Sequence, residues 1–228
     1  MSITQTLRWL NPPSGTILHV RSVETMGTQT TVRELWQSAD DPDAERQSTQ
    51  GATSFERAGD ELYDPATDTI YDAPAPAVAD GVKLKPGASK VATVGTPGTG
   101  KPGDENMPAA DPIVDKVRIL LQEGRMTVTE REPHNGTDAW AISLKPDVGR
   151  PVWTLWVSAA DGKPLELRDP GRDANEQPQA IRWPTYEVLP DSDANRLLTL
   201  TGAHPSARVV HDADQDAAAQ QRLMPPKP

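Results

Sequence analysis

The chain has 228 residues, of which 36% are hydrophobic and 25% are charged, a composition typical of a globular protein. Its formal net charge of −10 at pH 7 excludes the basic surface that non-specific binding to nucleic acid or anionic lipid requires, so we expect no nucleic-acid partner. The absence of cysteine excludes disulfides, thiolate metal ligands and thiol nucleophiles.

The first third of the chain reads as one short helix followed by strands. Apolar residues at helical spacing predict a helix over residues 3–10. Alternating stretches separated by turn residues predict strands over residues 15–26 and 30–38 and a polar edge strand over 45–51. Two further hairpin arms are expected within residues 53–72. Strands at this spacing are typical of an antiparallel meander.

Residues 73–110 break this pattern, because they are rich in proline and glycine and poor in large apolar side chains. We interpret them as a flexible insertion, with a short strand at Val91–Val94, within one domain that spans residues 1–228. The stretch GTPGTGKP at 95–102 resembles the beginning of a phosphate-binding loop. Pro102 replaces the serine or threonine that would hold a magnesium ion, so no nucleotide cofactor is expected.

The next segment, residues 112–123, carries the clearest helical pattern of the chain. Asp111 suits the capping position before the helix, Pro112 its first position and Gly124 its exit. The helix has one apolar stripe, formed by Ile113, Val117, Leu120 and Leu121. Such a stripe must pack against another element.

A second block of strands follows this helix. The predicted strands and helices are 125–132, 137–146, a hairpin over 151–168, a strand over 179–190, a short helix over 191–200 and a helix near the end of 207–226. Two blocks of strands separated by a helix favour the α+β class, with an antiparallel sheet, over an alternating βαβ fold.

The first arm of the hairpin at 151–168 is apolar on both faces. Side chains alternate along a strand, so Trp153, Leu155 and Val157 share one face while Val152 and Trp156 take the other. Such a strand is either covered on both sides or lines an apolar space. Ordinary packing of the tryptophans in a sheet core remains open as the alternative.

No residue set predicts a catalytic or metal site. The four histidines have neither HxH nor HExxH spacing, and the acidic stretch at 40–43 lacks the glycine and the later glutamate of a calcium loop. No GxSxG motif is present. We therefore expect neither an enzyme, nor a metal site, nor a cofactor.

Residues 154–168, TLWVSAADGKPLELR, resemble a hairpin of the LolA-type and LppX-type lipoprotein carriers. The match rests on Trp156, Val157, Asp161, Gly162, Pro164 and Leu165, whereas Ser158 stands where those carriers usually have an acidic residue. Residues 61–72 resemble a hairpin that recurs in actinobacterial extracytoplasmic proteins of this type. Residues 111–126 resemble the helix that precedes their second block of strands.

This resemblance implies an antiparallel curved sheet that forms an unclosed β-barrel with plug helices. In such proteins the apolar space between sheet and helices holds acyl chains, or the fold serves as the outer domain of a membrane-linked regulator such as a sigma-factor partner. The resemblance also implies a place in the cell envelope, outside the cytoplasm. Export or anchoring would then depend on a segment outside this sequence.

We therefore predict a non-catalytic extracytoplasmic domain that binds a lipid or a lipoprotein acyl chain between sheet and helices. The alternative is a protein-interaction or sensory domain of a membrane-bound regulator, with a membrane-protein partner and no small ligand. A carrier requires an apolar cavity, whereas an interaction domain has a filled core. The predicted cavity wall comprises Val152, Trp153, Leu155, Trp156, Ile113, Val117, Leu120 and Leu121.

Overall fold

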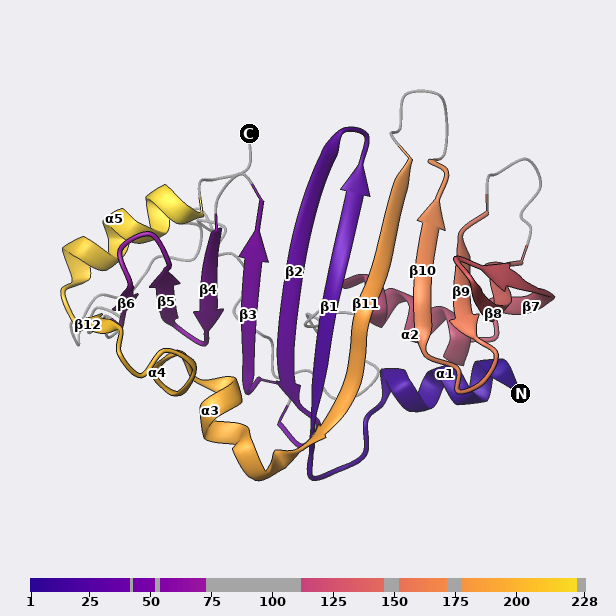
Figure 1. Cartoon of the computed structure of the whole chain (residues 1–228), viewed down its shortest axis with the longest axis horizontal. Helices are drawn as coiled ribbons and strands as arrows, with labels where there is room; N and C mark the ends of the chain where they lie inside the picture. Colours follow the sequence, from indigo (N-terminus) through magenta and orange to yellow (C-terminus); the bar gives the residue numbers. More distant parts are fainter. Residues whose placement is uncertain (42, 52–53, 73–111, 146–151, 172–177, 225–228) are drawn as a thin grey trace, which may run out of the picture.

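The computed structural model describes residues 1–41, 43–51, 54–72, 112–145, 152–171 and 178–224. Twelve strands form one sheet in the order β12–β6–β5–β4–β3–β2–β1–β11–β10–β9–β8–β7, which runs from β12 at one end to β7 at the other (Figure 1). The strands are β1 (Thr16–Met26), β2 (Gln29–Ser38), β3 (Glu45–Gln50), β4 (Ser54–Ala58), β5 (Glu61–Asp64), β6 (Thr69–Tyr71), β7 (Met126–His134), β8 (Thr137–Leu144), β9 (Thr154–Ser158), β10 (Pro164–Asp169), β11 (Gln179–Pro190) and β12 (Arg208–Val210).

The helices flank this sheet. They are α1 (Ser2–Leu10), α2 (Pro112–Gln122), the 3₁₀ turn η1 (Asp191–Asp193), α3 (Ala194–Leu198), α4 (Leu200–Ala203) and α5 (Ala213–Leu223). Asp212 caps α5 by accepting hydrogen bonds from the backbone N–H groups of Asp214 and Gln215. Residues 191–200, where the sequence predicts one short helix, form η1, α3 and the beginning of α4.

The predicted fold class is confirmed. The sheet is open and curved, and its neighbouring strands pair antiparallel except for β6 and β12, which are parallel. The two blocks of strands join in the middle, where β1 pairs with β11 from Thr16 opposite Pro190 to Met26 opposite Gln179. Strands from both sides of the predicted insertion therefore belong to one sheet.

One strand assignment is wrong in its position. The polar segment predicted as an edge strand forms β3, which lies inside the sheet between β2 and β4. Its polar side chains find partners on the neighbouring strands: Arg46 binds Glu56 on β4 and lies over the ring of Trp36 on β2. The predicted insertion at 73–110, the strand at Val91–Val94 and the loop at 95–102 lie outside the described residues.

The two faces of the sheet carry different layers. The α2 face, which bears Leu18, Leu35 and Leu155, is covered by α1 and α2, and α2 crosses behind β11 and its neighbours in Figure 1. The opposite face bears Trp36 and Glu166 and is packed by α4 through Leu200, Tyr63 and Ile70 near β5 and β6. At that end α5 packs on the α2 face, where its Ala219 and Leu223 contact Leu62.

Candidate functional site

The apolar layer between α2 and the sheet is where the sequence places a ligand cavity. Here α1 and α2 contribute Leu10, Val117, Leu120 and Leu121 to the largest cluster of buried apolar side chains. The strands contribute Leu18, Val20, Leu35, Met126, Ile142, Leu155, Val157, Leu167, Ile181, Trp183 and Tyr186 to the same cluster. The structure therefore brings together four of the predicted wall residues: Leu155, Val117, Leu120 and Leu121.

Side chains fill this layer around its strand residues. Leu155, Val157 and Ile142 are 0% exposed, and Val117 is 2% exposed. A side chain that no water molecule can touch borders no void large enough to hold water. An acyl chain therefore finds no preformed space next to Leu155, and its entry requires that a helix moves.

The remaining wall residues lie at the margin or elsewhere. Trp153 precedes β9 and packs against the edge of the cluster, with Lys116 Nζ 4.1 Å from the centre of its ring. Val152 is half-buried beside it. Trp156 lies on the opposite face of the sheet, as the alternation along the strand predicts. Ile113 belongs to α2, and its side chain lies outside the described residues.

The N-terminal helix α1 also packs over this layer, although the predicted site does not include it. Trp9 donates from Nε1 to the carbonyl oxygen of Asp161 at 2.9 Å and meets the ring of Tyr186 edge-on. Gly162, at φ +84°, lets the β9–β10 turn approach α1 so closely that a Cβ atom there would lie 2.5 Å from Cβ of Gln5. The helical spacing of Ile3, Leu7 and Leu10 was the available signal for this packing.

Trp156 belongs to a polar cluster on the opposite face. Its ring stacks on His134 at 4.4 Å, and its Nε1 donates to Glu132 at 2.6 Å. The guanidinium carbon of Arg168 lies 5.1 Å from the ring centre. This tryptophan is therefore a polar-face residue with a hydrogen-bonded indole, in a different place from the four buried wall residues.

Glu166 organises this polar cluster. Its side chain is 1% exposed and accepts from Arg168 Nε at 2.5 Å, Asn135 Nδ2 at 2.9 Å and Arg182 Nε at 3.2 Å, while His134 Nε2 lies 3.0 Å from Oε2. Burial alone would raise the pKa of Glu166, but the hydrogen bonds from Arg168, His134 and Asn135 lower it from 4.5 to about 2. The carboxylate therefore stays ionised at neutral pH.

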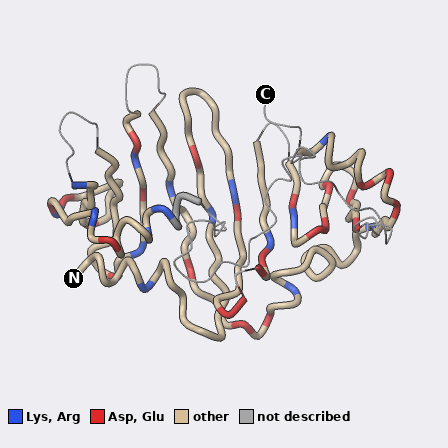
Figure 2. Tube along the Cα trace, turned by 180° about the vertical axis from the view of Figure 1, so that it is seen from behind, with Lys and Arg blue, Asp and Glu red and all other residues tan. Residues whose placement is uncertain are grey.

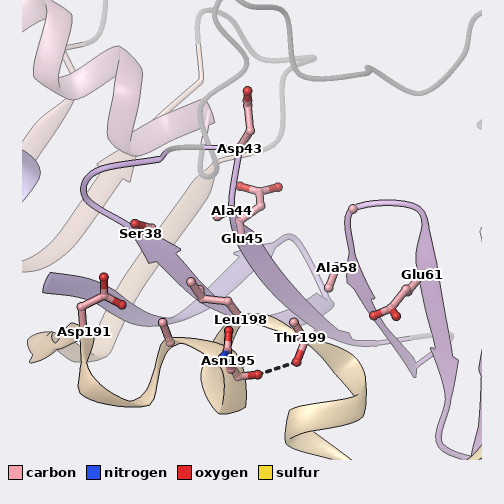
Figure 3. Close-up of a pocket in the computed structure, with 12 residues that line it drawn as sticks. Ser38, Asp43, Ala44, Glu45, Ala58, Glu61, Asp191, Asn195, Leu198 and Thr199 are labelled. Carbon is pink, nitrogen blue, oxygen red and sulfur yellow. Dashed lines mark hydrogen bonds between the residues drawn. The ribbon is translucent and has the colours of Figure 1, made fainter. Parts of the chain in front are cut away.

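A separate cleft lies between η1–α3 and the ends of β2 to β5 (Figure 3). Its volume is about 510 Å³. The residues that line it are Ser38, Asp43, Ala44, Glu45, Ala58, Gly59, Glu61, Asp191, Ala194, Asn195, Leu198 and Thr199. Four of these carry carboxylates, and the described residues of the lining include neither lysine nor arginine.

The carboxylates of this cleft are held at an electrostatic cost. Burial raises the pKa of Glu45 and of Glu61 above the ordinary value. The charge of Arg57 and a hydrogen bond from Gln47 compensate only partly at Glu45, as does the Leu200 N–H at Glu61. One carboxylate oxygen of Asp191 is buried without a hydrogen-bond partner. Such a site favours a cationic group, which would stabilise the ionised carboxylates.

A network of ion pairs attaches α3 to the strands beside this cleft. Arg46 donates from Nη1 to Glu56 at 2.7 Å and from Nε to the carbonyl oxygen of Leu197 at 2.7 Å, which ties α3 to β3. His204 lies 2.9 Å from the same Glu56 and stacks on Tyr63 at 3.8 Å. Helix α3, which contributes to the lining of the cleft, is therefore held to the sheet by this network.

Two further searches concern the described part of the chain. Within these residues no group of three or more histidine, aspartate or glutamate side chains is arranged to hold a metal ion. Each helix that the structure describes is too short or too polar to cross a membrane.

Comparison of the sequence with known proteins gives no match to a family model and no match to a curated protein. Comparison of the structure gives several similar folds. A MucA/MucB complex from Pseudomonas aeruginosa matches at a TM-score of 0.44 and 12% identity, over 93% of this chain and 63% of that chain. This chain therefore spans somewhat less than two thirds of the MucB structure.

Two other matches cover nearly the whole length of the similar structure. An uncharacterised conserved protein from Thermus thermophilus matches at a TM-score of 0.43 and 10% identity, over 92% of this chain and 97% of that chain. The LolA superfamily protein NE2245 from Nitrosomonas europaea matches at a TM-score of 0.27 and 10% identity, over 87% of this chain and 96% of that chain. A LolA superfamily protein is thus among the similar structures.

Proposed function

We propose that this chain is a non-catalytic, extracytoplasmic interaction domain of a membrane-bound regulator, and that its acidic cleft receives a cationic segment of a partner protein. The observation that carries the proposal is the cleft itself, with Asp43, Glu45, Glu61 and Asp191 in its lining and no described basic residue among them. The resemblance of the hairpin at 154–168 supports the extracytoplasmic placement and the absence of catalysis.

The charge of the cleft supports a basic partner over a small apolar one. The ionised forms of Glu45 and Glu61 are disfavoured by burial, so lysine or arginine side chains in the cleft would offset that cost. The net charge of −10 attracts a basic segment from a distance. The filled layer around Leu155 fits an interaction domain as well, because such a domain requires no cavity.

A second candidate function is the binding of a lipid or acyl chain under α2, in the layer lined by Leu155, Val117, Leu120 and Leu121. It is favoured by the size of the apolar cluster and by its cover, since α1 and α2 have only nine and eleven residues. Helices of this length are marginal without tertiary contacts, so α2 would be able to move aside. Binding here would be driven by burial of apolar area.

A peptide titration tests the first proposal. We expect a lysine-rich peptide to bind with an affinity that falls with added salt, and we expect the double variant E45Q/E61Q to weaken it by roughly tenfold or more, as for loss of charge-assisted contacts. The matched control is E123Q, which removes an exposed carboxylate from the region just after α2. Calorimetry measures each affinity. Equal affinity of E45Q/E61Q and E123Q would contradict the proposal.

A lipid assay separates the two candidates. The purified chain is incubated with a fluorescent fatty acid, and binding is compared between the native chain and L120A, which removes apolar area from the layer. For the interaction domain we expect no saturable binding of the probe. Saturable binding that L120A weakens would instead support the acyl-chain function and would leave the acidic cleft unused.

A further inference from the structure

The polar cluster around Glu166 lies apart from both sites discussed above and contains two arginines, Arg168 and Arg182, that share one buried carboxylate. Four donors converge on the carboxylate of Glu166: Arg168 binds Oε1, and His134, Asn135 and Arg182 share Oε2, one donor more than the two lone-pair positions of that oxygen. Arg182 makes the longest of these contacts, at 3.2 Å. Its guanidinium is therefore a surplus donor in the structural network.

Both arginines are fixed at one end and accessible at the other. Each donates only its Nε–H to Glu166, and their side chains are 52% and 62% exposed. Because the two Nε atoms bind the two oxygens of one carboxylate, the guanidinium groups lie close together on the same face. A guanidinium carries five N–H donors, so each arginine keeps its Nη donors for another acceptor.

The described helices leave this face uncovered around the two arginines. Helices α1 and α2 pack on the α2 face of these strands, whereas Arg168, Arg182 and Trp156 belong to the opposite face. The other carboxylate of the cluster, Glu132, is bound to the indole N–H of Trp156 at 2.6 Å. The carboxylates of Glu166 and Glu132 together offset the two guanidinium charges, so the pair offers a ligand its Nη–H donors rather than an excess of positive charge.

We infer that Arg168 and Arg182 form a binding site for a phosphate-type oxyanion on the opposite face of the sheet. Paired arginines recognise tetrahedral oxyanions because several N–H groups donate to one ligand at once. Glu166 would act as the anchor that holds both side chains in position before the ligand arrives, which lowers the entropic cost of binding. The site is independent of the proposed function of the cleft.

A phosphate titration tests this site on the native chain. With sodium phosphate at low ionic strength and sodium chloride as control, we expect the Nε–H signals of Arg168 and Arg182 to shift in a nuclear magnetic resonance spectrum. The Nε–H signal of Arg131, which pairs with Asp138 on β8, is expected to stay unchanged. Absence of a saturable shift with phosphate, in solution and on vesicles, would overturn the inference.

Variants give the second readout. R182Q removes the surplus donor and leaves three donors on Glu166, so the fold is expected to remain intact while phosphate affinity falls about tenfold. R131Q is the matched control, since it removes an exposed and ion-paired arginine of strand β7 in the same sheet. Equal affinity of R182Q and R131Q for phosphate would overturn the inference.

A third experiment distinguishes a soluble phosphorylated ligand from a lipid headgroup as the source of the oxyanion. Binding is measured to vesicles of phosphatidylglycerol and to vesicles of phosphatidylcholine alone, again with R182Q and R131Q. Binding to free phosphate that R182Q weakens supports a soluble phosphorylated ligand. Binding only to phosphatidylglycerol vesicles, weakened in R182Q, supports a lipid headgroup. Vesicle binding that R182Q leaves unchanged counts against the site.

Discussion

The two ends of the sheet are held together in different ways. From β2 through β1 and β11 to β7, which we call the apolar half, one large cluster of buried aliphatic and aromatic side chains joins the strands to α1 and α2. From β3 to β12, which we call the polar half, the buried apolar clusters are small, formed by Leu62, Ala219 and Leu223 on one face and Tyr63, Ile70 and Leu200 on the other.

Charged contacts attach the helices of the polar half. Arg46 ties α3 to β3, and Arg222 of α5 donates to the fully buried carboxylate of Asp64 at 2.7 Å. Burial alone would raise the pKa of Asp64, but hydrogen bonds from Arg222, Ala66 and Thr67 lower it. Acidic and basic residues are interspersed along the strands of both halves (Figure 2).

This difference explains where binding is expected in each half. Apolar packing is non-directional and fills its space, so the apolar half leaves no void beside Leu155. Directional ion pairs fix side chains without filling the volume between elements, and the 510 Å³ cleft lies in the polar half. The polar half should therefore respond to pH and salt more than the apolar half does.

The largest effect is expected from the centre of the apolar half. Leu155→Ala should lower the free energy of unfolding by about 2–5 kcal/mol, because it removes a fully buried side chain and leaves a cavity. Chemical denaturation measures the change. The control Val209→Ala, at a side chain that is 40% exposed, should cost no more than about 0.5 kcal/mol. Equal losses would show that the apolar layer is not packed as described.

The polar half has its own centre at Arg46. Arg46→Met should cost about 3 kcal/mol, because, among the residues that the structure describes, Glu56 then keeps only His204 as its partner in a largely buried position. The control Arg33→Met removes an arginine that is 48% exposed and should cost at most about 1 kcal/mol. If Arg46→Met is as mild as the control, charge does not hold this half together.

The contact between α1 and the β9–β10 turn is tested at a glycine. Gly162→Ala should cost about 1–3 kcal/mol, because the new methyl group overlaps Gln5 and the backbone of Thr6. Gly136→Ala is the matched control, since Gly136 has nearly the same φ, +81°, but nothing lies within 4 Å of the position. Hydrogen exchange of α1 should rise in the first variant and stay the same in the second.

Glu166 gives the apolar half one pH-dependent element. Its pKa of about 2 lies below the ordinary 4.5, so the stability it contributes is complete above pH 4.5 and is lost as the pH falls toward 2. Glu166→Gln should therefore flatten the acid limb of the stability curve between these values. Thermal unfolding across this pH range measures the slope, and an unchanged slope would contradict the role of the carboxylate.

The smallest effect is a gain. Burial raises the pKa of Glu45, so its ionised form destabilises the folded chain once the pH exceeds the ordinary value. Glu45→Gln should then raise the melting temperature slightly at neutral pH and leave it unchanged at strongly acidic pH. A loss of stability at neutral pH would mean that the cleft does not strain this carboxylate.

The sequence predicts the apolar half better than the polar half, for a physical reason. Alternation and helical spacing depend on hydrophobic periodicity, so β9, α2 and the outward position of Trp156 follow from the printed residues. The interior position of β3 does not, because a polar strand inside a sheet depends on partners such as the carbonyl group of Leu197 that are distant along the chain. The cleft and the four donors around Glu166 arise only when distant segments meet.

Hydrogen exchange of the native chain with and without a lysine-rich peptide tests the central claim most directly. The account predicts new protection in the backbone of residues 43–45, 58–61 and 191–199, around the acidic cleft, and no change in α1 or α2. Two results would contradict it. One is protection by the peptide that is confined to α1 and α2; the other is no protection by the peptide while a fatty acid protects α2.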